Sequence, residues 1–428
     1  MKIFVLVVFI LVYVLILVFP KYKVLSAGVA ALLTVGGVLI FGYSDFGSAV
    51  SAINYNVLLM LIGIMLTVGL FSESGMPNRL ADKLMSKIPN ALPAVIIICV
   101  LSGLVSAFID NVATVLMLAP IGFALAWKAE ISPVPVIIGI AVSSNLQGAA
   151  TLVGDTTSIM LGDYADMSFM DFFFLDGKFS IFWAVELGML LTIPVLYFIF
   201  RKSNKRICIT SENIQVTTYF PSILLVLNII LLVVVSFIPN KPDITNGIIC
   251  TVIGVIGFVY YSIKFKTNAI ASVKKLIDFE TIFFLFFLFI LIFAVEKVGI
   301  IADISSFFAR LGSKNVFLLY TLIVFGSVLI SAFIDNIPYV ATMLPVISSL
   351  CVSLSGVSPY LLYFGLLCGA TLGGNITPVG ATANVVGIGI LRKEGYKVSS
   401  KDFFKIGIPF TLVAVLGGYA LIYLVWGI

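Results

Sequence analysis

Long apolar runs, separated by short polar segments, dominate this sequence of 428 residues. Eight of these runs are long enough to cross a hydrocarbon core of roughly 30 Å as helices. Two further stretches, 92–162 and 313–391, are apolar but repeatedly interrupted by Gly, Asn, Asp, Pro and Thr. We interpret each of these as a re-entrant hairpin followed by one crossing with an interrupted middle. The eight continuous runs are 3–20, 24–43, 57–71, 180–200, 219–238, 246–263, 280–297 and 403–427.

The composition supports a membrane protein. Hydrophobic residues make up 61% of the chain and charged residues only 11%, against about 25% charged in soluble domains. The predicted fold class is therefore an all-α polytopic membrane protein whose main partner is the lipid bilayer, with about ten transmembrane helices plus two re-entrant hairpins. The net charge of +5 gives no reason to expect a nucleic-acid partner. Histidine is absent, which excludes His-ligated metals and His proton relays, and no cofactor is expected.

The basic residues indicate how the chain is oriented. Of the 25 Lys and Arg residues, nineteen fall on one side of the predicted layout and six on the other. Because cytoplasmic loops carry the excess of Lys and Arg, the first side is predicted to be cytoplasmic. Both termini are then expected outside, in a multi-pass protein of the cytoplasmic membrane.

The chain contains an internal repeat. The sequence Ser106–Asn111 recurs letter for letter as Ser331–Asn336, 225 positions later. The predicted topology inserts the two copies from opposite sides, an arrangement found in many secondary transporters. The elements of this prediction are a first inverted repeat (1–200, with hairpin 92–128 and broken helix 134–162), a cytoplasmic linker (201–218) and a second inverted repeat (219–428, with hairpin 313–355 and broken helix 358–391).

Three carboxylates within the interrupted segments are the strongest candidates for chemistry. No Lys or Arg lies within ten residues of Asp110, Asp155 or Asp335 in the sequence, and an unpaired charge is costly within the membrane. Non-helical backbone at this depth is tolerated only where protein covers it or it lines a wet cavity. Na⁺ or H⁺ is therefore the expected partner of these acids, since oxygen ligands suit a hard cation. The alternative for Asp110 and Asp335 is that they only cap the helix after each hairpin tip.

The interrupted segments together predict one central ion-binding site. Amides and hydroxyls there would supply uncharged ligands, although Gly, Ser and Thr are also ordinary helix-packing residues in membranes. The predicted binding residues are Asp110, Asn111, Asn145, Asp155, Thr156, Thr157, Ser158, Asp335, Asn336, Asn375, Thr377, Thr382 and Asn384. Among them, those predicted to hold Na⁺ are Asp110, Asn111, Asp155, Asp335, Asn336 and Asn375.

These motifs resemble the ion transporter superfamily. The Asp-Asn tips at 110–111 and 335–336 and the Gly-Asp-Thr-Thr break at 154–157 are similar to those of its NhaD-type antiporter and P-protein branches, and 374–404 resembles the P-protein and ArsB-like permease region. The related divalent anion/sodium symporters carry Ser-Asn-Thr at each tip. Asp replaces that Ser here, which disfavours dicarboxylate binding. The resemblance implies a citrate-transporter-like domain, a transport half that moves like an elevator against scaffold helices, and a possible homodimer.

The predicted function is secondary active transport of a small ion by Na⁺ or H⁺ coupling, with cation/proton exchange favoured. The alternatives are a permease for arsenite, antimonite or an inorganic or carboxylate anion such as citrate, and an ion channel on the same fold. An enzyme is not expected, because the sequence has no H-E-x-x-H or G-x-S-x-G motif, and a pump is not expected, because it has no P-loop.

Overall fold

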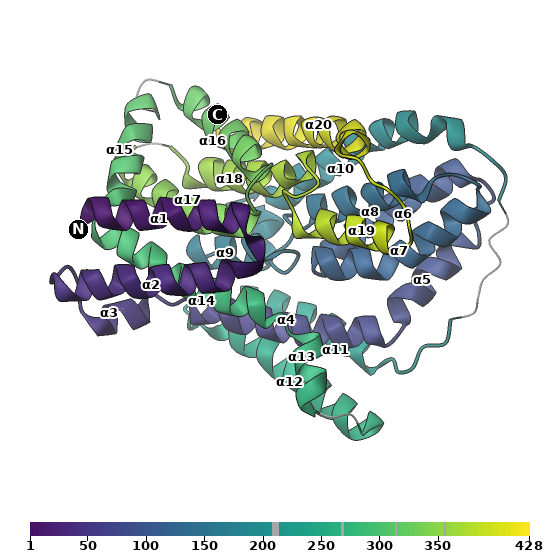
Figure 1. Ribbon diagram of the computed structural model, residues 1–428, viewed down its shortest axis with the longest axis horizontal. Helices are drawn as coiled ribbons and strands as arrows, with labels where there is room; N and C mark the ends of the chain where they lie inside the picture. Colours follow the sequence, from purple (N-terminus) through teal and green to yellow (C-terminus); the bar gives the residue numbers. More distant parts are fainter. Residues whose placement is uncertain (208–213, 267–268, 313–314, 355–356) are drawn as a thin grey trace.

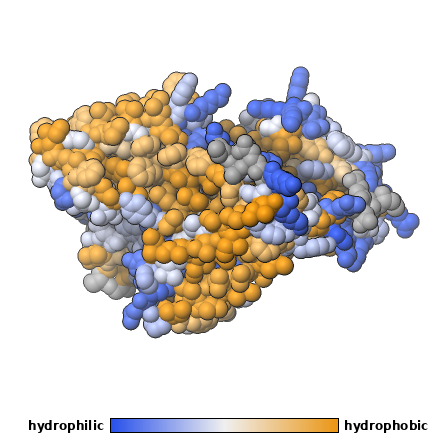
Figure 2. All heavy atoms as spheres, turned by 90° about the horizontal axis from the view of Figure 1, so that it is seen from below, coloured by the Kyte–Doolittle hydropathy of each residue, from blue (hydrophilic) through white to orange (hydrophobic). Residues whose placement is uncertain are grey.

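Helices with a largely apolar surface make up almost all of the protein. The computed structural model describes residues 1–207, 214–266, 269–312, 315–354 and 357–428. Within them, eight helices are long and apolar enough to span a membrane. Large apolar side chains point outward, and hydrophobic residues cover most of the face seen in Figure 2, with hydrophilic residues gathered mainly toward its right-hand end. The protein is therefore a multi-pass membrane protein.

The first half of the chain forms ten α-helices, a short hairpin and three 3₁₀ turns among its described residues. The hairpin strands β1 (Phe174–Leu175) and β2 (Lys178–Phe179) are antiparallel, with Phe174 opposite Phe179. The helices and turns are α1 (Lys2–Val18), η1 (Pro20–Tyr22), α2 (Lys23–Ile40), α3 (Phe46–Ser51), α4 (Tyr55–Glu73), α5 (Met76–Met85), α6 (Ala91–Ser106), α7 (Asn111–Lys128), α8 (Pro133–Gln147), α9 (Thr156–Tyr164), η2 (Met170–Phe172), α10 (Ile181–Phe200) and η3 (Arg201–Ser203).

The second half repeats this order of elements. The hairpin α6–α7, the interrupted pair α8–α9 and α10 recur as α16–α17, α18–α19 and α20 (Figure 1). The described elements are α11 (Phe220–Ser236), α12 (Thr245–Phe265), α13 (Ala269–Leu276), α14 (Phe279–Lys297), α15 (Ile300–Gly312), α16 (Val316–Ser331), α17 (Asn336–Ser353), α18 (Pro359–Gly373), η4 (Gly374–Ile376), α19 (Thr382–Lys393) and α20 (Ser400–Trp426).

Each repeat contributes helices to two structural parts. In the part that we call the scaffold, α4 packs along α12 and α11, and α14 packs along α2 and α1, so each contact joins the two repeats. The close approach of α4 to α12 requires glycine, since a Cβ at Gly63 would lie 2.1 Å from the carbonyl carbon of Cys250. The part that we call the bundle contains α6–α10 and α16–α20, with α10 packed on α20 and α19 on α7 and α8. The predicted fold class, with two repeats, is confirmed.

Element boundaries differ from the predicted ranges by a few residues. The first hairpin runs from Ala91 to Lys128, and its tip lies between Ser106 and Asn111. The ends of the predicted hairpin 313–355, and residues 208–213 of the predicted linker, lie outside the described residues. Sequence reasoning assigned no element to α3, α5, α13 or α15. These helices are short, and polar and charged residues interrupt them, so they lack the long apolar run on which the prediction relied.

Candidate ion-binding site

The hairpin tips and the helix breaks are held together in the same way in both repeats. Thr151 donates a hydrogen bond from its hydroxyl to the carbonyl of Ala107, and Thr377 donates one to the carbonyl of Ala332. A Cβ at Gly380 would lie 2.7 Å from that Ala332 oxygen, so the backbone can approach only because no side chain is there. Each hairpin tip is thus fixed against the break of its own repeat.

All three predicted carboxylates cap helices. The Oδ1 atom of Asp110 accepts from the N–H groups of Val112 (2.9 Å) and Ala113 (3.2 Å) at the start of α7. Asp335 accepts from the N–H of Ile337 at 3.4 Å, and Asp155 caps α9 through the N–H of Thr156 at 2.6 Å. The capping role that the sequence left open is therefore present, but it uses only one oxygen of each carboxylate.

The second carboxylate oxygens meet neutral polar groups or the cavity. Oδ2 of Asp155 accepts from the Thr157 hydroxyl (3.2 Å) and the Asn336 amide (3.1 Å). The latter bond joins the break of one repeat to the hairpin tip of the other. Oδ2 of Asp335 accepts from the hydroxyl of Thr382 at 3.4 Å. No hydrogen bond reaches Oδ2 of Asp110 from any residue that the structure describes.

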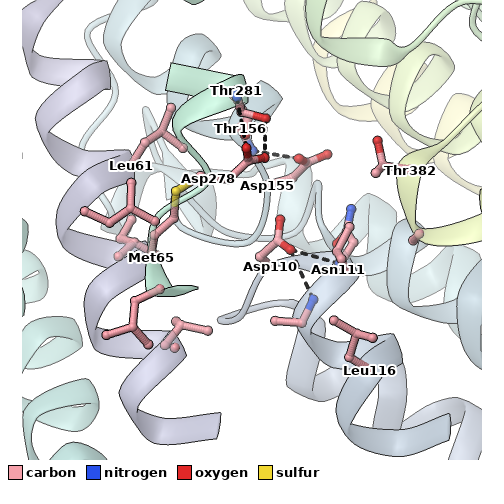
Figure 3. Close-up of a pocket in the computed structure, with 18 of the residues that line it drawn as sticks. Leu61, Met65, Asp110, Asn111, Leu116, Asp155, Thr156, Asp278, Thr281 and Thr382 are labelled. Atoms are coloured by element: carbon pink, nitrogen blue, oxygen red, sulfur yellow. Dashed lines mark hydrogen bonds between the residues drawn. The ribbon is translucent and has the colours of Figure 1, made fainter. Parts of the chain in front are cut away.

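A cavity of about 1050 Å³ brings these groups together. Figure 3 shows Asp110, Asp155 and Thr382 around this space, with Leu61 and Met65 of α4 on its scaffold side. Its lining continues to Glu73 and Lys275, the latter of which is 74% exposed, so the cavity mouth lies at this end of α4. The predicted residues that line the cavity are Asp110, Asn111, Asn145, Asp155, Thr156, Asp335, Asn336 and Thr382.

Five predicted residues are in the surrounding framework instead of the cavity lining: Thr157, Ser158, Asn375, Thr377 and Asn384. Ser158 donates from its hydroxyl to the carbonyl of Gly148 at 3.0 Å, and Asn384 donates from its amide to the carbonyl of Gly374, also at 3.0 Å. These two bonds close the break loops in equivalent places. Such side chains hold the shape of the breaks, and the prediction that they bind the ion directly has no support from their positions.

The ends of the two interrupted helices are joined through side-chain amides. Asn145 donates from Nδ2 to the carbonyl of Thr371 (2.9 Å) and to Oδ1 of Asn375 (3.1 Å). It accepts from the amide of Asn111 at 3.1 Å, and Asn375 donates to the carbonyl of Val142 at 2.9 Å. Both Asn145 and Asn375 are at most 1% exposed. This network satisfies buried polar groups that would otherwise be costly in lipid.

Two scaffold residues near the site were missed by sequence reasoning. Asp278 caps α14 by accepting from the N–H (3.1 Å) and hydroxyl (2.6 Å) of Thr281, and both residues line the cavity. The Asp-x-x-Thr pattern before an apolar run was a signal that could have been used. Lys23 of α2 is close enough for its charge to act on Asp335. Lys23 lies outside the broken segments, so no sequence pattern places it beside Asp335.

The charges of the site are unbalanced. Asp110, Asp155, Asp278 and Asp335 all line the cavity, whereas the lysines of its lining, Lys274 and Lys275, stand beside Glu73 at the mouth. Within the described part of the chain, however, no three acidic or Cys side chains come close enough to hold one metal ion. A cation bound here would use at most two carboxylates together with amide, hydroxyl or carbonyl oxygens.

Two repeats of re-entrant hairpins and interrupted helices, which enclose a polar cavity inside an apolar shell, define a membrane transporter. A family model described as "Citrate transporter" matches residues 4–355 and 244–427. The chain belongs to this family, within the ion transporter superfamily.

Several known proteins are similar to the chain. The "46 kDa membrane protein" of Mycobacterium leprae is 31% identical over 420 residues, covering 97% of this chain and 96% of that protein. The human "P protein" is 26% identical over 484 residues, 95% of this chain and 58% of that protein. The crystal structure of the YdaH transporter from Alcanivorax borkumensis matches with a TM-score of 0.62 at 17% identity, covering 89% of this chain and 87% of that one. The last similarity establishes the fold alone.

Proposed function

We propose that the protein exchanges Na⁺ for protons across the cytoplasmic membrane and that both ions use the carboxylates of the cavity. The observation that carries this proposal is the convergence of Asp110, Asp155 and Asp335 on one cavity, with Asp278 opposite. A carboxylate that binds a proton in one step and a cation in the next exchanges the two ions without any further group. Neutral Asn and Thr side chains around Asp155 complete an oxygen-rich environment for a hard cation.

The helix ends favour a cation over an anion. Free N–H groups at a helix N-terminus attract anions, but at α7, α9 and α17 carboxylates already occupy these groups. An anionic substrate would therefore meet negative charge at three of the four helix starts around the site. The fourth is different: α19 begins after Ala381 without a side-chain cap and borders the cavity. This end favours an anion such as citrate as the second candidate substrate.

The sidedness of the cavity fits alternating access. Its mouth lies beside Glu73, Lys274 and Lys275, on the face that the excess of Lys and Arg predicts to be cytoplasmic. In this proposal the conformation is open to the cytoplasm, both termini lie outside, and the bundle moves against the scaffold to open the cavity to the other side. The homodimer implied by the family resemblance stays a prediction.

Transport assays on the purified protein in liposomes test the proposal. We expect Na⁺ to dissipate an imposed proton gradient, and we expect Asp155→Asn to reduce this exchange by about tenfold or more, because one charged ligand is lost. Glu186→Gln is the matched control. Glu186 is a carboxylate within the membrane, on α10, that does not line the cavity, and its variant should keep the activity.

Two results would decide against Na⁺/H⁺ exchange. One is uptake of citrate or arsenite without Na⁺-dependent proton movement, which would support the anion or arsenite permease. The other is an unchanged rate for Asp155→Asn under conditions where Glu186→Gln is also unchanged.

A further inference from the structure

The end of α9 is fastened to the scaffold at the start of α4, opposite the end of α4 that borders the cavity mouth. Asp163 accepts hydrogen bonds from the side-chain amides of Asn54 and Asn56, the second at 2.6 Å. Asn56 itself accepts from the N–H of Gly247 in α12 at 2.7 Å. We call Asp163, Asn54 and Asn56 the outer latch. It ties one helix of the bundle to two helices of the scaffold.

The equivalent face of α19 is uncovered. In α9, Thr156 and Ile159 precede Asp163 at helical spacing and share its face, and Ile159 is only 1% exposed. In α19, the counterpart of Ile159 is Val385, which is 49% exposed. Gly389 stands where α9 has Asp163, and a Cβ added there would meet no described atom within 4 Å. The same surface is thus covered by the scaffold in the first repeat and free in the second.

The start of α14 is the structural counterpart of the start of α4. Asn54 and Asp278, 224 positions apart, each cap a helix through the N–H three residues later, at 3.0 and 3.1 Å. Two residues beyond each cap stand Asn56 and Glu280. The second repeat therefore has two acids at the positions where the first has two amides.

The partner for these acids lies one helical turn beyond Gly389. Arg392 follows Gly389 by three residues, which places it on the uncovered face of α19, and it is exposed. We propose that Arg392 forms an inner latch with Asp278 and Glu280 when the cavity closes at its present mouth. In the second repeat the positive charge of Arg392 complements the two acids. In the first repeat the carboxylate of Asp163 accepts hydrogen bonds from two amides. Lys23, 3.5 Å from Glu280, remains beside this pair.

When the outer latch breaks and the inner latch forms, the protein changes from this conformation, open at the present mouth, to one open on the opposite side. With the outer latch broken, α9 separates from α4, and with the inner latch formed, α19 covers the start of α14. The inference rests on the alternation in the proposed function, but it does not depend on which ion is carried. Asp163 and Arg392 act as positioning residues, because neither lines the cavity.

A side-specific labelling experiment tests the inner latch. Leu116 of α7 lines the cavity and is 52% exposed, whereas its counterpart Ala341 in α17 is 4% exposed. A membrane-impermeant maleimide should label Leu116→Cys from the cytoplasmic face and leave Ala341→Cys unlabelled from outside. Adding Asp163→Ala should reduce labelling at the cavity position about tenfold and allow labelling of its counterpart from outside. The reason is that the substitution removes hydrogen bonds to a charged group from the present conformation only. The chain without an added cysteine gives the background.

The role of Arg392 is isolated by a second substitution. In the Asp163→Ala background, Arg392→Ala should restore labelling of Leu116→Cys, and Glu280→Arg with Arg392→Glu should reduce it again. Lys393→Ala, at an exposed neighbouring position, should have little effect. Unchanged labelling in Asp163→Ala, or equal effects of Lys393→Ala and Arg392→Ala, would overturn the proposal. A labelling change of the expected kind without Na⁺-dependent proton movement would support the latches and reject Na⁺/H⁺ exchange.

Discussion

Asn145 is the residue whose removal should show most clearly what holds the two repeats together. Its side chain donates to Thr371 and Asn375 and accepts from Asn111, so Asn145→Ala removes three hydrogen bonds at a site that is 1% exposed. Buried hydrogen bonds contribute about 1 kcal/mol each in soluble proteins and about 0.6 kcal/mol each in membranes. The loss of all three gives an expected decrease of about 2–3 kcal/mol in the free energy of unfolding.

Reversible unfolding of the purified protein by a denaturing detergent, followed by circular dichroism, measures this decrease. Ser143→Ala is the matched control. Ser143 lies two residues earlier on the same helix, is 0% exposed, and its hydroxyl has no hydrogen-bond partner in the described structure. Its removal should be neutral or slightly stabilising. An Asn145→Ala variant within about 0.5 kcal/mol of the parent, or an equal loss for Ser143→Ala, would refute the reasoning.

Two further predictions concern Gly380 and Asp45. Gly380→Ala should unfold more readily than the parent in the same detergent titration, because its Cβ would meet the Ala332 carbonyl at 2.7 Å, whereas Gly389→Ala, into open space, should not. The Ser48 hydroxyl and N–H hold the pKa of the Asp45 carboxyl below its usual value. Asp45 therefore contributes stability to the start of α3 above its unfolded-state pKa and loses it as the pH falls through the folded-state pKa. The hydrogen-exchange protection factors of the α3 amides, corrected for the intrinsic pH dependence of exchange, should fall on acidification, and Asp45→Asn should abolish that fall.

The repeat was the part of the structure most readily predicted from sequence. Because Ser106–Asn111 and Ser331–Asn336 are identical, their two tips were expected at equivalent places, and both Asp110 and Asp335 line the same cavity. The Gly, Asn, Asp, Pro and Thr residues that interrupt 92–162 and 313–391 were expected to mark unwound backbone beside a wet cavity. That expectation follows from the cost of unpaired backbone in lipid, which is independent of the rest of the fold.

The sequence did not predict in the same way which polar residues line the cavity and which stabilise the breaks. Within an unwound segment no helical or strand period fixes the direction of a side chain. Thr382 and Asn384 are two residues apart, yet the first lines the cavity and the second closes the break loop. Asp278 and Lys23 come from scaffold helices far from the breaks in sequence, and only the tertiary arrangement brings them to the site.

The two repeats share a framework but differ in the residues that carry charge. Thr151 and Thr377 fix the hairpin tips in the same way, yet Asp155, which caps α9, corresponds to Ala381 before α19. A symmetric framework permits two related conformations of similar packing energy, since each repeat can adopt the arrangement of the other. Different charged residues at equivalent positions then make the two conformations differ in their affinity for an ion and in their closing contacts. A ligand can shift a population only through such a difference between states, so the asymmetry of side chains on the symmetric framework is what would couple ion binding to the change of access.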